Sequence, residues 1–198
     1  MRTKTIFSTI KVLVISTSLL ATQAFAEMTY KTDQGHTEVF FGWSHSGVSR
    51  QHAEFTKATG TLNLADDIEK SSVSVVIDAD SLSSGFAALD RHLKSPDFLD
   101  VAAHPEITFQ STGVTKTGDN TMEVTGDLTI HGVTQPVTLA AEMTHKGAHP
   151  VGKFFDHYKG EWIAFHATTE IDHQAFGVGS FSTGPIAIEI NTELKAVQ

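Results

Sequence analysis

Residues 124–143 read VTGDLTIHGVTQPVTLAAEM, and this stretch decides the fold class. Its apolar or small side chains fall on every second position: Val124, Gly126, Leu128, Ile130, Val137, Leu139, Ala141 and Met143. A period of two predicts strands with one apolar face and one wet face. His131-Gly132 separates the two runs and is typical of a turn. The stretch is therefore expected to form two strands joined by a turn.

The same period recurs through most of the chain. Further alternating runs cover residues 39–43, 73–77, 107–109, 163–171 and 186–190. With Phe55–Leu64 counted as one more strand, the chain holds about eight strands, which is typical of an antiparallel barrel or sandwich. Gly118-Asp119-Asn120 and Lys146-Gly147 are expected to be turns. A barrel of this size either fills its interior with side chains or holds a small ligand, and the periodicity does not distinguish between these two possibilities.

One segment departs from the strand period. Its apolar residues recur at helix-like intervals until a proline interrupts them: Phe86, Leu89, Leu93, Pro96 and Phe98. This pattern predicts one short helix near residues 85–93, followed by a loop. No linker, internal repeat or low-complexity tract divides the sequence. We therefore expect a single, mostly β domain over residues 27–198.

The first 26 residues have the three parts of a secretory signal peptide. A positively charged start precedes a short apolar run and a small-x-small cleavage site: Arg2, Lys4, Lys11, residues 12–20 and Ala24-Phe25-Ala26. The run is short for a membrane span, and no twin-arginine pair is present. An uncleaved anchor or a buried N-terminal helix is the competing interpretation. We expect cleavage before Glu27, export to the periplasm by the general secretory route, and no stable membrane insertion afterwards.

Composition excludes several classes of protein. The 198 residues are 40% hydrophobic and 19% charged, an ordinary globular balance. The net charge is −9, and loss of Arg2, Lys4 and Lys11 with residues 1–26 makes it −12, which argues against a nucleic-acid partner. There is no cysteine, so disulfide frameworks, zinc fingers and thiol nucleophiles are excluded.

Four stretches together resemble the YceI-like family, exported lipid-binding proteins with a lipocalin-like barrel. They are His36–His45 (HTEVFFGWSH), Val73–Ser81 (VSVVIDADS), Leu89–Ser111 (LDRHLKSPDFLDVAAHPEITFQS) and Gly126–Val137 (GDLTIHGVTQPV). The resemblance implies an antiparallel barrel whose apolar interior holds a polyisoprenoid or another long-chain amphiphile, and it implies no catalysis. One position departs from the family pattern: His173 stands where an arginine is usual, so a permanent charge there becomes pH-dependent.

The expected ligand-binding residues are apolar wall residues and a polar pair at the barrel mouth: Phe41, Trp43, Leu89, Arg91, His92, Leu93, Phe98, Phe109, Leu128, Ile130, Phe165 and Phe176. Val39, Phe41 and Trp43 are expected to point inward and Phe40 outward. Arg91 and His92 are expected to hold an anionic or strongly polar head group, because a guanidinium suits phosphate or carboxylate. The competing interpretations are core packing for the apolar residues and a solvated helix face for the charged pair.

The eleven histidines do not form a metal motif in the sequence. His145 and His149 would share a face only on a helix, which Gly147 and Pro150 oppose. His36 and His45 would lie near opposite ends of one strand. Asp78–Leu82 starts like a calcium loop but lacks its later ligands, and no protease, hydrolase or phosphate-binding motif occurs. No metal, cofactor or catalytic residue is therefore predicted.

These patterns predict a periplasmic, non-catalytic protein that binds and carries a long-chain lipid such as a polyisoprenoid or a fatty acid. Burial of the chain drives binding at about 0.8 kcal/mol per methylene. Two alternatives stay open: an enzyme that acts on a bound lipid, and a stress-related module with a filled core and a protein partner. A homodimer is expected only by analogy.

Overall fold

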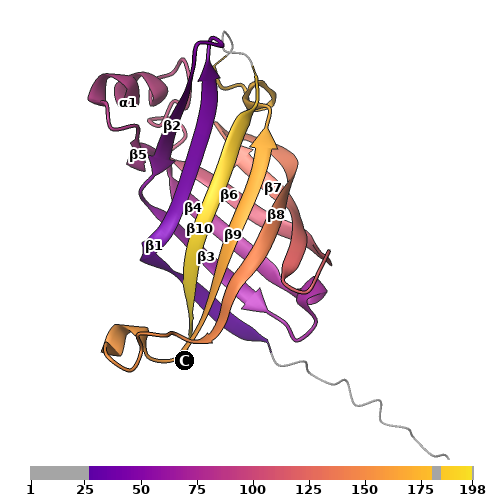
Figure 1. Cartoon of the computed structure of the whole chain (residues 1–198). Helices are drawn as coiled ribbons and strands as arrows, with labels where there is room; N and C mark the ends of the chain where they lie inside the picture. The colour runs from indigo at the N-terminus through magenta and orange to yellow at the C-terminus, as the bar shows by residue number, and fades with distance from the viewer. Residues whose placement is uncertain (1–26, 180–183, 198) are drawn as a thin grey trace, which may run out of the picture.

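The structure is a computed structural model that describes residues 27–179 and 184–197 (Figure 1). The predicted signal peptide, residues 1–26, lies outside the described residues. In the part of the chain that is described, no helix has the length and apolar character needed to cross a membrane.

The main body is a closed antiparallel barrel of eight strands, which confirms the predicted fold class. Each strand pairs with the next around the barrel, and the last pairs with the first. In barrel order the strands are β1 (Met28–His45), β3 (Ala58–Leu64), β4 (Ser72–Asp78), β6 (Glu106–Lys116), β7 (Thr121–Ile130), β8 (Val133–Ala148), β9 (Glu161–Ile171) and β10 (Ile186–Ala196).

Two further strands extend the wall at one end of the barrel. The start of β1 pairs with β3, whereas its end, Val39–His45, pairs with β2 (Ser49–Phe55). The short β5 (Leu82–Ser83) adds to the free edge of β2. Because β10 follows the other edge of β1 as far as Gly42, this end of the barrel is built from β1, β2, β5 and β10. Figure 1 shows it beside the helix.

The predicted helix is confirmed as α1 (Ala87–Leu93). The Asp90 carboxylate accepts hydrogen bonds from the backbone N–H and the hydroxyl of Ser84, at 2.7 and 2.5 Å. These bonds hold the pKa of Asp90 below its ordinary value. Leu93 is the buried residue of the helix. Short 3₁₀ helices complete the chain: η1 (Ile68–Lys70), η2 (Ala79–Ser81), η3 (Asp156–Tyr158) and η4 (His173–Phe176).

Two details of the predicted strands are wrong. Phe55–Leu64 is not one strand, because Thr56 and Lys57 turn the chain between β2 and β3 and hydrogen-bond to Ser81. Lys146-Gly147 is not a turn, because β8 continues through it to Ala148 and Gly147 pairs with Trp162 of β9. The turns at residues 118–120 and at His131-Gly132 are confirmed.

The alternation of the sequence sets which side chains face the interior. Along β7 the burial alternates from Thr121 to Ile130, with the apolar or small residues inside. In β1, Val39 is buried in the core and Phe41 and Trp43 pack against it, as predicted. Phe40 lies on the opposite face, beside Glu189 and Thr168 of the outer wall. The interior is therefore lined by one apolar face of every barrel strand.

Candidate functional site: an apolar interior with one polar rim

Two cavities occupy the barrel interior. The first, here called the mouth cavity, measures about 600 Å³ and lies at the α1 end. Its wall comes from α1, the loop after it, the end of β1, η4 and the start of β10. The second, the inner cavity, measures about 210 Å³ and lies deeper in the barrel. Every barrel strand contributes an apolar side chain to it, including Val39, Leu62, Val75, Phe109, Leu128, Leu139, Phe165 and Ile190.

The two cavities lie next to each other in the barrel. Five side chains belong to the walls of both: Phe41, Phe55, Ile107, Ile130 and Ile188. Specific ligand sites typically measure about 300–1,000 Å³, so the interior is large enough to hold a ligand rather than only side chains. Polar groups in the inner wall are mainly hydroxyls that find partners, as in the 2.9 Å contact between Thr37 and Thr192. A long apolar chain is the ligand that such a wall suits.

The structure places nearly all of the predicted site residues in this wall. The mouth cavity takes in Phe41, Trp43, Leu89, His92, Leu93, Phe98, Ile130 and Phe176. The inner cavity takes in Phe41, Phe109, Leu128, Ile130 and Phe165. Their contact with a ligand stays a prediction, but their convergence on the barrel interior is a property of the fold.

Arg91 is the exception. It lies on α1 but is exposed and contributes to neither cavity wall. Leu89, His92 and Leu93 occupy the helix face that borders the mouth cavity, and this leaves Arg91 toward solvent. In the sequence, Arg91 stands between two leucines that were expected to point inward. The sequence does not say which face of the helix points toward the barrel, and so it could not place the Arg91 side chain. A role in holding the head group is therefore not supported by its position.

His173 supplies a polar group to the wall that the sequence argument did not include among the site residues. It is only 6% exposed and lines the mouth cavity. Its Nδ1 lies 2.6 Å from the backbone carbonyl of Val178, which can only accept, so Nδ1 donates and the neutral ring keeps an acceptor at Nε2. That Nε2 is buried and has no hydrogen-bond partner among the described residues. It can accept a hydrogen bond from a ligand.

Other wall residues were also missed by the sequence argument. Ile186 and Ile188 of β10, Val178 after η4, and Ser44–Gly47 at the end of β1 all border the mouth cavity. The alternation over residues 186–190 could have identified Ile186 and Ile188 as wall residues, because it places both on the apolar face of the strand. Nothing local marks Val178 or Ser44–Gly47, because they reach the cavity only through the closure of the barrel.

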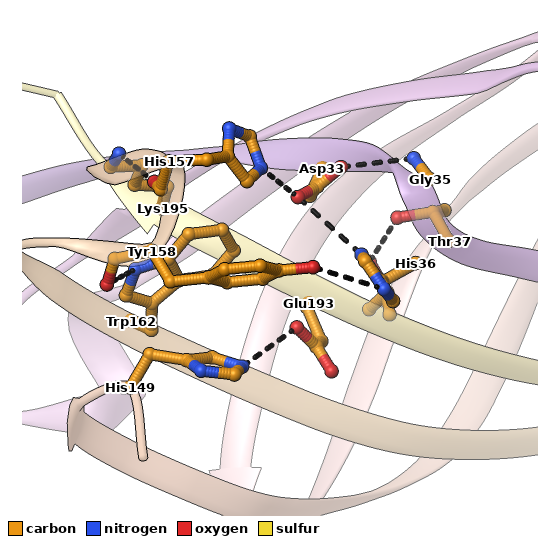
Figure 2. A network of polar contacts seen from close by, with 11 residues as sticks. Asp33, Gly35, His36, Thr37, His149, His157, Tyr158, Trp162, Glu193 and Lys195 are labelled. Atoms are coloured by element: carbon orange, nitrogen blue, oxygen red, sulfur yellow. Dashed lines mark hydrogen bonds and ion pairs between the residues drawn. The ribbon is translucent and has the colours of Figure 1, made fainter. Parts of the chain in front are cut away.

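A polar network covers the outside of the barrel at the other end (Figure 2). The Asp33 carboxylate contacts His157 Nε2 at 2.7 Å and His36 Nδ1 at 3.5 Å, and it accepts a bond from the Gly35 N–H at 2.9 Å. Tyr158 lies 3.3 Å from His36 through its hydroxyl. Burial alone would raise the pKa of Asp33, but the bonds from His157 and Gly35 outweigh it and hold that pKa below the ordinary 3.8. The network fixes the loop after β8 to β1.

Asp33→Asn is expected to lower the free energy of unfolding by about 1 kcal/mol at neutral pH, because the network loses its charged acceptor. The native state favours the ionised form of Asp33, because its pKa is lower in the folded protein than in the unfolded chain. The Asp33 carboxylate therefore contributes fully to the free energy of unfolding above the ordinary pKa of 3.8. This contribution disappears as pH falls through the lowered native pKa. Urea unfolding at about pH 7 and about pH 2.5 measures both values. Asp66→Asn, at an exposed position, is the control. An equal loss for Asp33→Asn at both pH values would contradict this explanation.

The fold and the cavity together define a class, the β-barrels that bind an apolar ligand in their interior. The comparison with known families agrees with it. The model of the YceI-like domain matches residues 30–197, and this chain belongs to that family.

Relatives of the same length are known. A UPF0312 protein of Pseudomonas fluorescens strain SBW25 is 36% identical over 193 residues, which cover 96% of this chain and 97% of that protein. A UPF0312 protein of Vibrio parahaemolyticus is 36% identical over 154 residues, or 77% of this chain and 78% of that protein.

Solved structures show the same barrel at low sequence identity. BcnA of Burkholderia cenocepacia superposes with a TM-score of 0.69 at 22% identity, over 82% of this chain and 98% of that one. The YCEI protein of Campylobacter jejuni gives 0.66 at 21%, over 79% and 90%. A polyisoprenoid binding domain from Saccharophagus degradans gives 0.61 at 11%, over 85% and 98%.

Proposed function

We propose that this protein is a non-catalytic carrier of the periplasm that holds a long-chain amphiphile, a polyisoprenoid or a fatty-acid-type lipid. The observation that carries the proposal is an apolar barrel interior that holds two neighbouring cavities, whose walls share five residues. A compact ligand needs only one of the two, whereas a long chain has the length to reach from the mouth cavity into the inner cavity. The likeness in fold to a polyisoprenoid binding domain supports the same ligand class.

The two cavities differ in polarity, and this orients the ligand. The mouth cavity carries polar side chains in its wall, namely Ser44, His45, Ser46, His92 and His173. The inner cavity is walled by apolar side chains and a few threonines and serines. Each buried methylene contributes about 0.8 kcal/mol, so the tail gains most in the inner cavity. The polar end then lies in the mouth cavity, where the Nε2 of His173 accepts a hydrogen bond from a head group that carries a hydroxyl or another donor.

The side chains that line the two cavities also provide evidence on the alternative function, an enzyme that acts on a bound lipid. Among the described residues, the titratable side chains of the mouth cavity are His45, His92 and His173, and no carboxylate lines either cavity. A histidine that acts as a general base is usually oriented by a carboxylate or a similar partner. His173 is instead oriented by a backbone carbonyl. This arrangement suits binding better than catalysis.

The proposed periplasmic location is based on the N-terminal segment. Positive charge, a short apolar run and an Ala-x-Ala site together favour export with removal of residues 1–26. N-terminal sequencing of the exported protein should begin at Glu27, in the fraction released by osmotic shock. An exported form that begins at Met1 would contradict this part of the proposal.

Mass spectrometry of an organic extract from natively purified protein tests the function. An intact lipid at about one per chain supports a carrier. Incubation of the purified protein with that lipid should leave it chemically unchanged, whereas altered lipid would favour the enzyme. An extract without lipid, together with no uptake of added polyprenol, would favour a filled-core module and contradict the proposal.

Trp43 is expected to report on the occupant of the cavity. It lines the mouth cavity and stacks on Phe41 at 5.8 Å between ring centroids. In a Trp162→Phe background, its emission should be blue-shifted and should change when lipid is removed and restored. Fluorescence titration with a polyprenol measures this change. An emission typical of a water-exposed indole that ignores added lipid would contradict the placement of Trp43.

A further inference from the structure

Three metal-ligating side chains meet beside the mouth cavity, outside its wall. Each of Asp100, His104 and His131 offers one ligand atom, and the three atoms lie within 4.8 Å of one another. The two imidazole rings stand edge to face, with 4.5 Å between their centroids. All three side chains are half-buried. The cluster joins two segments that are distant in the sequence, the loop before β6 and the turn between β7 and β8.

The local backbone holds the three residues in place. The backbone N–H of His104 donates to the carbonyl of Asp100 at 2.8 Å, which closes the loop between them. Asp100 and His131 both adopt positive φ angles, 42° and 53°, which are uncommon for residues other than glycine. His131 and Gly132 together form the tight turn from β7 to β8. The positions of the side chains are therefore set by turns rather than by long mobile loops.

Gly132 provides the space in which the His104 ring lies. A Cβ at Gly132 would be 2.8 Å from Cε1 and 3.0 Å from Nδ1 of His104. The 2.8 Å distance is shorter than real Cβ contacts, and φ at position 132 is +73°, so another residue there would be strained and the ring would have to move. Glycine at this turn therefore lets the imidazole lie close to His131 without strain.

The polar side-chain atoms of the cluster have no partner outside it among the described residues. Neither imidazole, nor the Asp100 carboxylate, makes a side-chain hydrogen bond or an ion pair with another of the described residues. Half-buried imidazoles and carboxylates are usually satisfied by a partner or by water. Three such groups that converge without a side-chain partner among the described residues can all bind the same ligand.

We propose that Asp100, His104 and His131 bind one divalent transition-metal ion of the zinc class. Two imidazole nitrogens and one carboxylate oxygen are a common ligand set for Zn²⁺, with water in the fourth position. Zinc–ligand bonds of about 2.0–2.2 Å place tetrahedral ligand atoms about 3.4 Å apart. The ligand atoms now lie within 4.8 Å of one another, so each pair would have to approach by at most about 1.4 Å to reach that distance. The site does not depend on what occupies the barrel.

The ion would tie the rim of the mouth cavity together. Asp100 directly follows Leu99, which lines that cavity with Phe98, and His131 directly follows Ile130 of its wall. A bond through the metal therefore fixes the segment after α1 to the end of β7. In lipid-loaded protein, this clamp is expected to slow the release of the ligand.

Calorimetric titration of zinc into metal-free mature protein, prepared without a histidine tag, tests the proposal. One ion per chain is expected. Asp100→Asn and His131→Gln should each weaken binding at least about 100-fold, while their circular dichroism stays that of the wild type. Gly132→Ala should also weaken it, although all three ligands remain. His149→Gln and His166→Gln, which change histidines of other clusters, are matched controls and should bind as the wild type does.

Two further readouts make the outcome decisive. Free zinc at about 100 times Kd should raise the Tm of the wild type by about 5–10 °C and leave that of Asp100→Asn unchanged. Cobalt(II) in place of zinc should give the visible spectrum of a tetrahedral site. No binding to the wild type, binding unaffected by Asp100→Asn and His131→Gln, or loss of binding in His149→Gln would each overturn the proposal.

Discussion

Ala141→Phe is expected to abolish the binding of long polyprenols while short prenyl alcohols still bind. Ala141 lies in the wall of the inner cavity and pairs with Ala167, whose side chain is equally small. A cavity of about 150 Å³ holds a benzene molecule, so a phenyl ring takes up most of the 210 Å³ present. If four or five methylenes of the tail lose their burial, the loss is about 3–4 kcal/mol, or roughly 200- to 1,000-fold in Kd.

The adjacent residue offers a matched control. Ala140 is exposed on the outer face of the same strand, so Ala140→Phe adds the same side chain without entering the barrel. Competition titrations against a fluorescent fatty acid compare the two variants with a long polyprenol and with farnesol. Circular dichroism confirms that both barrels are folded. Equal affinity of Ala141→Phe and Ala140→Phe for the long polyprenol would show that the tail does not enter the inner cavity.

Trp162→Ala is expected to lower the free energy of unfolding by about 3–5 kcal/mol. Trp162 is 1% exposed, and its indole N–H donates to the Tyr158 carbonyl at 3.0 Å. Its ring packs against Tyr158 and His149, with 5.4 and 5.2 Å between centroids, and Lys195 lies over it (Figure 2). Since the stability of a domain is typically about 5–15 kcal/mol, this loss is a large share of the total.

Urea unfolding measures the effect, and the loop after β8 contains a control. Phe154 is 69% exposed, so Phe154→Ala should change stability by less than about 0.5 kcal/mol. Trp162→Phe keeps most of the packing and loses the hydrogen bond, and should cost about 1 kcal/mol. A loss below 1 kcal/mol for Trp162→Ala would mean that the loop after β8 is not held by this residue.

The strands could be predicted because their signal is local. Along β7, the alternation of apolar and polar residues in the sequence is the same as the alternation of burial. The helix was equally visible, since Leu89 and Leu93 stand four residues apart and both border the mouth cavity. The split between β2 and β3 was not visible. It depends on hydrogen bonds from Thr56 and Lys57 to Ser81, whose approach no local pattern encodes.

The site was predictable to the extent that it is the inner face of the strands. An inward residue such as Phe109 borders the cavity because the period of β6 puts it there. Whether the barrel contains a cavity depends on the total volume of the inward side chains. That volume is set by all eight strands together, so no local pattern reveals it. The choice between Arg91 and His173 as the polar group of the wall likewise depended on how α1 and η4 rotate against the barrel. Side-chain chemistry alone favoured the arginine.

The pairing of β1 with β10 has a consequence for the order of folding. Tyr30 pairs with Ala196 and Phe41 with Ile188, so the ring is sealed by contacts between the two ends of the domain. Such non-local pairing slows folding, because the loop-closure entropy is lost before the contacts form. A chain that emerges N-terminus first cannot complete its barrel until the 11 residues of β10 are available. Until then β1 and β9 each present an unpaired edge, and such edges can pair with strands of other chains.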